Sequence, residues 1–337
     1  MQSELARSGD ESAFAALTEP YRREIHLHCY RMLGSFEEAE DMVQETLFRA
    51  WRSRAAFEGR STVRTWLYRI ATNACLDYLE SQSRRPRSLE SPQNEVNWIQ
   101  PYPDRILDEI ASPAAGPDAL VIEKETIELA YLIAIQYLPP RQRAVLLLRD
   151  ALGLSAKEVA DVLDDSLASV NSALSRARSV MRKKLPHQYA ESRTKNTATA
   201  AERKLVERYM DAIDRADVTA LAELLREDAR LTMPPFPTWF QGREEITRDF
   251  VNFTDPSSPS HMGPVRTVAT AANRQPAVAA YVRRPGDPSV HPLGIDVLRI
   301  EGGFIVEITR FIPAGPPRTP DPIHARLFAE FGLPPTL

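Results

Sequence analysis

The sequence is poor in cysteine and has no long uninterrupted apolar run. Only two cysteines occur, Cys29 and Cys75, and each lies within an apolar helical pattern. A disulfide framework or a thiolate zinc site therefore has little support, and we expect buried free thiols and no metal. No stretch approaches the roughly eighteen apolar residues of a membrane span, and residues 1–10 lack the apolar run of a secretory signal. We therefore expect a cytoplasmic protein.

Glycine is scarce as well, with 13 residues against 27 prolines, which indicates stiff linkers between folded parts. The 43% hydrophobic and 26% charged residues are typical of soluble globular domains and argue against disorder throughout. A chain of 337 residues exceeds what one hydrophobic core usually organises, so we expect two or three compact units. The net charge of -4 averages over segments of opposite sign, so local charge indicates which partners each segment binds.

The first part of the chain, residues 13–83, has the pattern of a helical bundle. Its apolar residues recur at spacings of three and four, which is the helical period. Ser35 and Glu38 form a capping-box pattern that predicts the start of a helix. A polar loop at residues 59–62 separates this helix from a second one, which ends in a basic cluster at residues 84–87.

The middle of the chain consists of a linker and a second helical block. Residues 88–118 are rich in proline and acidic side chains and show no sustained period, which predicts a linker. Helical periodicity resumes over residues 120–185, where Ser155 and Glu158 form another capping-box pattern. Two short helices follow, and the second, residues 167–184, ends in basic side chains. This order is typical of a helix-turn-helix.

After a polar spacer at residues 187–200, the pattern changes to helix followed by strands, which is typical of an α+β domain. The strand-like runs lie at residues 229–233, 265–272, 277–283, 294–300 and 304–311. Gly302 and Gly303 stand between the last two runs and predict a tight hairpin.

Three blocks of the helical part resemble one family. Residues 38–51 read EAEDMVQETLFRAW and resemble the region 2 helix of sigma-70 factors. Residues 65–73, TWLYRIATN, together with Asp77 resemble the promoter-reading helix of that region. Region 4 of the same factors is similar to three further segments, LPPRQRAVLL at 138–147, EVA at 158–160 and RAR at 176–178. A short linker without a folded domain between the two regions is typical of the extracytoplasmic-function group.

The remaining third, residues 201–313, resembles the SnoaL-like fold related to ketosteroid isomerase, a curved sheet wrapped by helices around a conical pocket. This resemblance rests on element order and on MPPFPTWFQG at residues 233–242, which looks like the sequence in sigma factors with such an extension. The linker segment WIQPYPD at residues 98–104 points to the same subgroup.

We therefore expect a multidomain protein. Two all-α modules, a region 2 helical bundle and a region 4 helix-turn-helix, precede an α+β SnoaL-like cone with a curved mixed or antiparallel sheet. The expected boundaries are region 2 at 10–87, the acidic linker at 88–119, region 4 at 120–186, a spacer at 187–200, the SnoaL-like domain at 201–315 and a tail with a short helix at 316–337.

The resemblance implies a sigma factor that binds core RNA polymerase, recognises the minus-ten and minus-thirty-five promoter elements and initiates transcription. Such a protein is not an enzyme, needs no cofactor and lies in the cytoplasm, at the nucleoid when it is part of the holoenzyme. The C-terminal domain is expected to be a built-in regulator, a small-molecule ligand is a further candidate partner, and no membrane partner is expected. Two alternatives stay open. One is a sigma-like DNA-binding regulator that does not recruit polymerase, and the other is such a regulator fused to a small-molecule-binding or isomerase-type enzyme domain.

The resemblance also assigns residues to each interface. Docking on the polymerase clamp helices is expected from Asp41, Gln44, Glu45 and Arg49. Minus-ten recognition is expected from Phe57, Arg60, Ser61, Thr62, Arg64, Arg69, Asn73, Asp77, Arg84 and Arg85. Minus-thirty-five recognition is expected from Ser169, Asn171 and Ser172 on base edges and from Arg176, Arg178 and Arg182 on phosphates. A merely solvated surface is the alternative for any single side chain among them.

Two further groups belong to the linker and the C-terminal domain. Trp98, Tyr102, Pro103 and Asp104 are expected to contact the C-terminal domain, and this contact is expected to be regulatory. In the family the acidic linker threads through the polymerase, and plain disordered solvation is the alternative. Candidate pocket residues are Tyr209, Asp228, Trp239, Tyr281, His291, Asp296 and Arg310. None of them forms a diagnostic catalytic motif, so we expect no catalytic residues.

Overall fold

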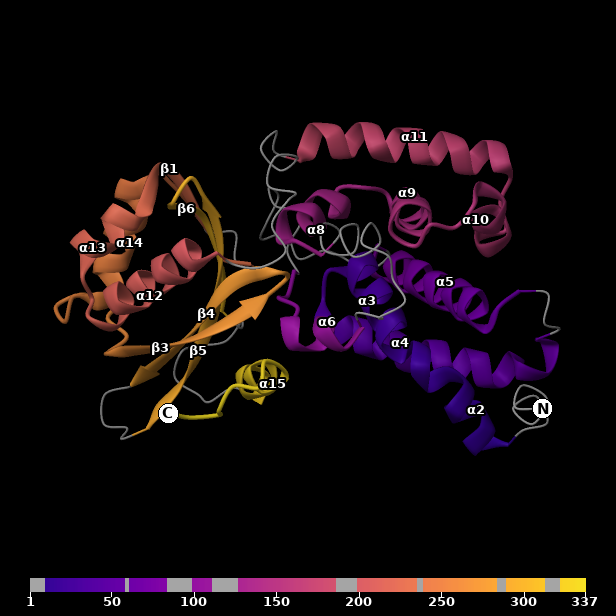
Figure 1. Cartoon of the computed structure of the whole chain (residues 1–337), viewed down its shortest axis with the longest axis horizontal. Coiled ribbons are helices and arrows are strands. Elements are labelled where there is room, and N and C mark those ends of the chain that lie inside the picture. The colour runs from indigo at the N-terminus through magenta and orange to yellow at the C-terminus, as the bar shows by residue number, and fades with distance from the viewer. Residues whose placement is uncertain are drawn as a thin grey trace. The chain divides into compact units, whose positions relative to one another are not determined.

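The computed structural model of the chain describes residues 10–57, 61–83, 99–110, 127–185, 199–234, 239–283, 289–312 and 322–337. The chain divides into two compact units, which are described separately (Figure 1). Met1–Glu90 and Ile110–Arg193 form the first unit, and Ser91–Glu109 and Thr194–Leu337 form the second. The described linker residues 99–109 therefore belong with the C-terminal domain.

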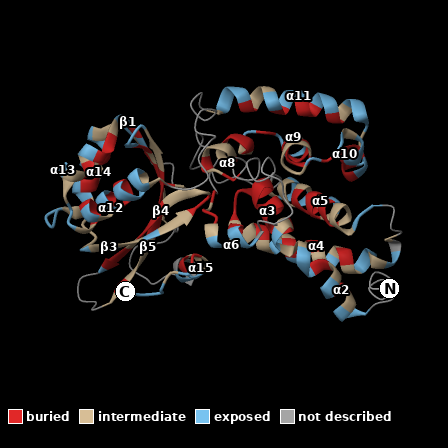
Figure 2. Ribbon diagram, in the orientation of Figure 1, coloured by how far each residue is buried: buried red, intermediate tan, exposed pale blue. Residues whose placement is uncertain are grey.

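In the residues described, the first half of unit 1 is a bundle of four helices. They are α2 (Glu11–Thr18), α3 (Arg22–Leu33), α4 (Phe36–Ser53) and α5 (Val63–Ser83), with short 3₁₀ turns at Glu19–Tyr21 and Arg54–Ala56. Gly34, at φ 80, ends α3, and the Ser35 hydroxyl accepts a hydrogen bond from the Glu38 backbone N–H at 3.2 Å. This confirms the start of the helix that the capping pattern predicts. Buried residues lie on the inner sides of these helices (Figure 2).

The second half of unit 1 has the predicted helix-turn-helix. It comprises α8 (Leu129–Gln136), α9 (Pro140–Leu146), the π-helical segment η3 (Leu147–Ala151), α10 (Ala156–Leu163) and α11 (Leu167–Lys184). The capping box at Ser155 and Glu158 is confirmed, with hydrogen bonds of 3.2 and 2.7 Å between the two residues. Asp164 turns the chain between α10 and α11 in the left-handed conformation, at φ 49.

The C-terminal domain is the expected α+β fold with a mixed sheet of six strands in the order β2-β1-β6-β5-β4-β3. The strands are β1 (Leu225–Thr232), β2 (Trp239–Gln241), β3 (Val265–Ala272), β4 (Gln275–Arg283), β5 (Val290–Glu301) and β6 (Phe304–Phe311). The pairing of β1 with β6 is parallel, and all other pairs are antiparallel. The predicted hairpin is present, because Gly302 and Gly303 adopt φ 58 and φ 83 between β5 and β6.

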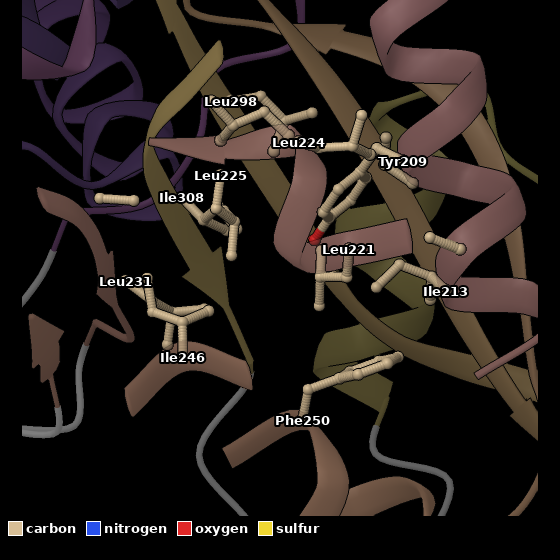
Figure 3. Packing of buried hydrophobic residues seen from close by; sticks show 14 of the residues in the cluster. Tyr209, Ile213, Leu221, Leu224, Leu225, Leu231, Ile246, Phe250, Leu298 and Ile308 are labelled. Carbon is tan, nitrogen blue, oxygen red and sulfur yellow. The ribbon is translucent and has the colours of Figure 1, made fainter. Parts of the chain in front are cut away.

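Helices α12 (Ala200–Asp214), α13 (Val218–Leu224) and α14 (Arg243–Thr254) cover one face of this sheet. Their apolar side chains pack with those of the strands in one core, which includes Tyr209, Leu224 and Phe250 (Figure 3). On the opposite face, Phe328 of α15 (Pro322–Glu330) packs edge-on against Tyr281 at 5.0 Å between ring centroids.

The structure differs from the sequence expectation in the linker. Residues 99–110 were expected to lack regular structure, yet they contain helix α6 (Asp104–Ile110) and a β-bridge between Pro103 and Ala272. Tyr102 and Leu107 of this segment have 0% and 1% of their surface exposed. Tyr102 and Asp104 of this segment are hydrogen-bonded to Asn273 and Arg274, about 170 residues away.

Candidate functional site

The four expected polymerase-docking residues lie on one face of α4. Asp41, Gln44, Glu45 and Arg49 line a groove of about 570 Å³ whose other wall is α5. Their spacing of three, one and four residues places them along adjacent turns of a helix. Phe48, which the sequence reasoning missed, also lines the groove and is 55% exposed. An exposed aromatic ring among carboxylates is typical of a protein-binding surface.

Arg49 organises the charges of this groove. Its Nε donates to Glu45 Oε1 at 2.6 Å, and its Nη1 donates to Asp77 Oδ2 at 2.6 Å. Burial alone would lower the pKa of Arg49, but its hydrogen bonds with Asp77 and Glu45 raise it. Asp77 was expected near the promoter bases, and the structure places its carboxylate in the groove beside the expected docking residues.

The expected base-capture loop is described at both ends. The Phe57 ring packs against Trp66 at 4.8 Å between centroids, and Ser61 and Thr62 are exposed. Thr62 Oγ1 accepts a hydrogen bond from the Thr65 backbone N–H at 3.1 Å at the start of α5. Arg60, Arg84 and Arg85 lie outside the described residues.

Along α5, the expected DNA-contacting side chains differ in their surroundings. Arg69 is exposed and Asn73 is half-buried. Arg64 donates from Nε to Glu24 Oε2 at 2.7 Å and lies over the Tyr68 ring, 5.1 Å from its centroid. Arg64 thus stabilises the bundle itself, and a phosphate would have to compete with Glu24 for it.

The residues expected to read the minus-thirty-five element lie along α11, from its N-terminus to its basic C-terminal end. Asn171 and Ser172 are exposed, whereas the Ser169 hydroxyl donates to Asp165 Oδ2 at 2.9 Å. The first residue of α11, Leu167, is 50% exposed. Sequence reasoning missed Leu167 because apolar residues in a helix-turn-helix are ordinarily assigned to the core; its position directly after the Ser166 N-cap was the available signal.

The three arginines of α11 are not equivalent. Arg178 makes a two-point ion pair with Asp150 of η3, at 3.0 and 2.6 Å. Arg176 donates to the Ser172 hydroxyl at 2.7 Å, and Arg182 is exposed near the C-terminal end of the helix. The π-helical segment therefore places Asp150 where it orients Arg178, while the other two remain on the open surface.

The linker segment is held by the turn between β3 and β4. The Tyr102 N–H donates to Asn273 Oδ1 at 2.8 Å, and the Asn273 N–H donates to the Tyr102 carbonyl oxygen at 2.9 Å. The Arg274 N–H donates to Asp104 Oδ1 at 2.8 Å, and the Arg274 guanidinium pairs with Asp108. We call this set of contacts the linker clamp. Trp98 lies outside the described residues.

The turn in the clamp has an unusual backbone. Asn273 and Arg274 both adopt the left-handed conformation, at φ 55 and φ 59. Asparagine tolerates this conformation, but arginine does so only with compensation from its surroundings. The contacts with Asp104 and Asp108 supply that compensation. Sequence reasoning missed both turn residues, because the Asn-Gly, Asp-Gly or Gly-Gly pair that usually signals such a turn is absent here.

Three of the seven expected pocket residues come together. Tyr209 Oη donates to Asp296 Oδ2 at 2.8 Å, and Arg310 donates to both oxygens of Asp296 at 2.7 and 2.8 Å. Burial raises the pKa of Tyr209; burial alone would lower that of Arg310, but pairing with Asp296 raises it. Both oxygens of Asp296 thus accept hydrogen bonds from side chains of the domain itself.

The other four expected pocket residues lie elsewhere. The Tyr281 hydroxyl donates to the Pro334 carbonyl oxygen at 2.9 Å, beneath α15. Asp228 is exposed and pairs with Arg226, and Trp239 is 54% exposed. His291 is half-buried, paired in the sheet with Val282. Alternation of side chains along the strands separates Tyr281 from the face that carries Asp296.

A cavity beside Asp296 and Arg310 has a volume of about 40 Å³ and is otherwise mainly apolar, with Phe250 and Met262 in its wall. This is room for about one or two water molecules, whereas ligand pockets usually measure at least about 300 Å³. Among the residues that the structure describes, no group of histidine, cysteine and carboxylate side chains could hold a metal ion. Within the same residues, no helix is both long and apolar enough to cross a membrane.

Three family models match the chain, one for each of the two sigma modules and one for the C-terminal domain. Residues 17–85 match Sigma-70 region 2, residues 129–181 match Sigma-70 region 4, and residues 206–308 match the SnoaL-like domain. The fold and these matches define a sigma-70-type protein with an appended SnoaL-like domain.

Comparison with individual proteins identifies the family of the chain more narrowly. ECF RNA polymerase sigma factor SigG of Mycobacterium tuberculosis is 40% identical over 345 residues, which cover 98% of this chain and 86% of SigG. ECF RNA polymerase sigma factor SigW of Bacillus subtilis is 31% identical over 181 residues, 53% of this chain and 92% of SigW. The chain therefore belongs to the extracytoplasmic-function (ECF) RNA polymerase sigma factor family. The crystal structure of M. tuberculosis SigJ, 21% identical, has a similar fold, with a TM-score of 0.57 over 96% of this chain and 99% of SigJ.

Proposed function

We propose that the chain binds core RNA polymerase through the α4–α5 groove and directs it to promoters that carry minus-ten and minus-thirty-five elements. The observation that carries this proposal is the groove itself, which combines acidic side chains with the exposed Phe48 ring. A partner helix with basic and apolar residues complements such a surface. Arg49 is held between Glu45 and Asp77, so the groove is ordered before the partner arrives.

Promoter opening requires an unstacked base to be captured in a polar pocket, which costs a few kcal/mol and is offset by stacking and hydrogen bonds. In our proposal the loop of residues 57–62 and the exposed side of α5 supply these contacts. The Phe57 ring is anchored on Trp66, so the loop leaves the bundle at a defined place. Ser61 and Arg69 are exposed and available for base and phosphate contacts.

Reading of the minus-thirty-five element falls to the N-terminal half of α11. Asn171 and Ser172 are exposed and can donate to or accept from base edges in the major groove. Leu167 offers an apolar contact suited to a thymine methyl group. Arg176 and Arg182 contribute sequence-independent phosphate contacts. Arg178 is oriented by Asp150 and acts together with it.

Run-off transcription with purified core polymerase tests this proposal. We expect promoter-dependent transcripts with the chain and none without it. The opposing function, a DNA-binding regulator that does not recruit polymerase, predicts promoter binding without association with core polymerase. Failure to associate with core polymerase at any salt concentration would contradict our proposal.

We further propose that the C-terminal domain is a built-in regulator that acts through the linker clamp, in a protein that works in the cytoplasm and at the nucleoid. The clamp buries Tyr102 and engages the acidic side chains of Asp104 and Asp108. A tethered domain acts at a high effective concentration, so even a modest clamp is occupied in the free chain. Deletion of residues 201–337 is expected to change promoter-dependent transcription. Identical activity of the truncated and full-length chains over a range of concentrations would refute regulation.

A small-molecule ligand and an isomerase-type activity are the weaker alternatives for this domain. The cavity of about 40 Å³ and the hydrogen bonds to both oxygens of Asp296 favour a structural role for the triad of Tyr209, Asp296 and Arg310. Turnover of a small hydrophobic substrate that is lost on Asp296→Asn would support the enzyme instead.

A further inference from the structure

The two sigma modules of unit 1 contact each other at the ends of their helices. Helix α3 contacts α8 and α9, and α5 contacts α9 and α10. Arg143 of α9 takes part in this contact with only 5% of its surface exposed. Its guanidinium donates a hydrogen bond to the carbonyl oxygen of Met32, in the last turn of α3. Gln136, the last residue of α8, donates from Nε2 to the Arg31 carbonyl oxygen at 3.4 Å.

Helix ends explain why an arginine is placed here. The last four carbonyl groups of a helix lack partners within it, and the C-terminal end carries the negative pole of the helix dipole. Arg143 satisfies two such ends at once, because it also donates to the carbonyl oxygens of Ile135 at 3.1 Å, Gln136 at 3.0 Å and Leu138 at 3.2 Å. Burial lowers the pKa of Arg143 to about 10, so the guanidinium stays charged at neutral pH.

This contact cannot persist while both promoter elements are bound. The names of the elements imply a separation of about 25 base pairs, which is roughly 85 Å at 3.4 Å per pair. Met1–Glu90 and Ile110–Arg193 form one compact unit. A compact unit of about 170 residues has a radius of gyration of about 16 Å and a diameter on the order of 40 Å. The modules must therefore separate before α5 and α11 can occupy their elements together.

We propose that Arg143 is a latch that holds regions 2 and 4 in a closed state in the free chain and releases them in the promoter-bound holoenzyme. Only the release step rests on the proposed function. On release, the Met32 and Arg31 carbonyl groups are hydrated, whereas the bonds from Arg143 to the end of α8 remain within region 4. Arg143 thus keeps most of its partners in both states, which lets the latch open without leaving a buried charge unpaired.

Distances between spin labels in the full-length chain test the latch. Labels are attached through Ala16→Cys on α2 and Lys157→Cys on α10, both exposed and outside every proposed interface. The native Cys29 and Cys75 each have 0% of their surface exposed, so labelling is selective. We expect one narrow, short distance in the free chain and a shift to long distances when core polymerase and promoter DNA are added.

Two variants weaken the latch and one serves as a matched control. Gln136→Ala removes the bond to the Arg31 carbonyl, which crosses between the two modules, and also a bond from Arg143 to the Gln136 side-chain oxygen, which lies within region 4. Arg143→Lys replaces the branched donor with a single ammonium. Either variant should raise the long-distance population of the free chain about fivefold, as expected for the loss of one hydrogen bond between the modules. Arg141→Lys makes the same chemical change on α9, but Arg141 bonds only to Leu163 and Asp165 of region 4 among its described contacts. We expect the control to behave as the unmodified chain.

A broad or long distance in the free unmodified chain would overturn the latch, as would unchanged distances in the folded variants. Thermal unfolding shows whether each variant is folded, and if Arg143→Lys is not, Gln136→Ala decides alone. If core polymerase does not bind the chain at all, the proposed function fails. The distances of the free chain and its variants still decide the latch in that case.

Discussion

Replacing Asn273 by glycine should open the linker clamp without disturbing the hairpin that carries it. Asn273 and Tyr102 each have 0% of their surface exposed, and the Asn273 side-chain oxygen accepts the Tyr102 N–H at 2.8 Å. Glycine adopts the left-handed conformation of residue 273 readily, so the turn itself is retained. What is lost is the acceptor, and an unpaired buried N–H costs about 1–3 kcal/mol.

That cost corresponds to a rise of about 5- to 150-fold in the population of the open clamp. Hydrogen exchange resolved to single amides measures this population, because a locally opened amide exchanges in proportion to it. We expect the Tyr102 and Arg274 amides to exchange faster by this factor, while amides in the centre of β5 keep their rates. Asn273→Asp is the matched control, since it retains an acceptor oxygen and tolerates the left-handed backbone. If Tyr102 exchanges at the same rate in folded Asn273→Gly as in the unmodified chain, the Asn273 side chain does not hold the clamp closed.

Three other predictions concern the first unit. Asp77→Asn removes one of the two carboxylates that hold Arg49, and we expect weaker binding to core polymerase, by about three- to tenfold in Kd measured by fluorescence anisotropy. Arg182→Ala is expected to weaken promoter binding equally for all sequences and to reduce the slope of log K against log salt by about one. Burial lowers the pKa of His26 to about 4 and of His28 to about 3. Between pH 6.5 and 4 the unfolded chain therefore binds more protons than the folded chain, so the free energy of unfolding falls as the pH falls. Chemical denaturation of the full-length chain should show a loss of about 2 kcal/mol per histidine at pH 5, and a free energy of unfolding that is flat from pH 7 to 5 would contradict it.

Elements whose signals are local could be predicted from the sequence. The capping box of Ser155 and Glu158 involves residues three apart, and the Gly302-Gly303 turn requires only the conformational freedom of glycine. The amphipathic period likewise located the helices of both sigma modules. Such features depend on the chain within one or two turns, and tertiary contacts did not override them.

Features that depend on distant contacts could not be predicted. The turn at Asn273 and Arg274 has no glycine, and its left-handed arginine is explained only by Asp104 and Asp108 of the linker. Helix α6 was missed for the same reason, because it has only seven residues and two of its partners, Arg274 and Glu330, are distant in the sequence. Strand β2 has three residues, which is too short for any alternation to be recognised.

The role of Arg143 was also invisible in the sequence, where it is one of several arginines in a region 4 pattern. Only the structure shows that Arg143, unlike Arg141 two residues earlier, reaches the end of α3. Strand geometry decides which of the candidate pocket residues come together. Residues on neighbouring strands share a face only when their register is known, and Tyr281 and Asp296 lie on opposite faces of the sheet.

The length of the linker decides how the clamp can regulate. About 45 residues separate the end of α5 from the start of α8, and fully extended they would reach about 150 Å. With residues 99–109 held in the clamp, about 35 residues remain, which still reach about 115 Å and exceed the roughly 85 Å between the promoter elements. The clamp therefore does not act as a short tether that keeps regions 2 and 4 together. It must act by occupying the linker, since Asp104 and Asp108 cannot pair with Arg274 and present their charge to the polymerase at the same time. Lengthening the linker on either side of residues 99–109 should then leave regulation intact, whereas Arg274→Glu, which repels both aspartates, should abolish it in the same run-off assay.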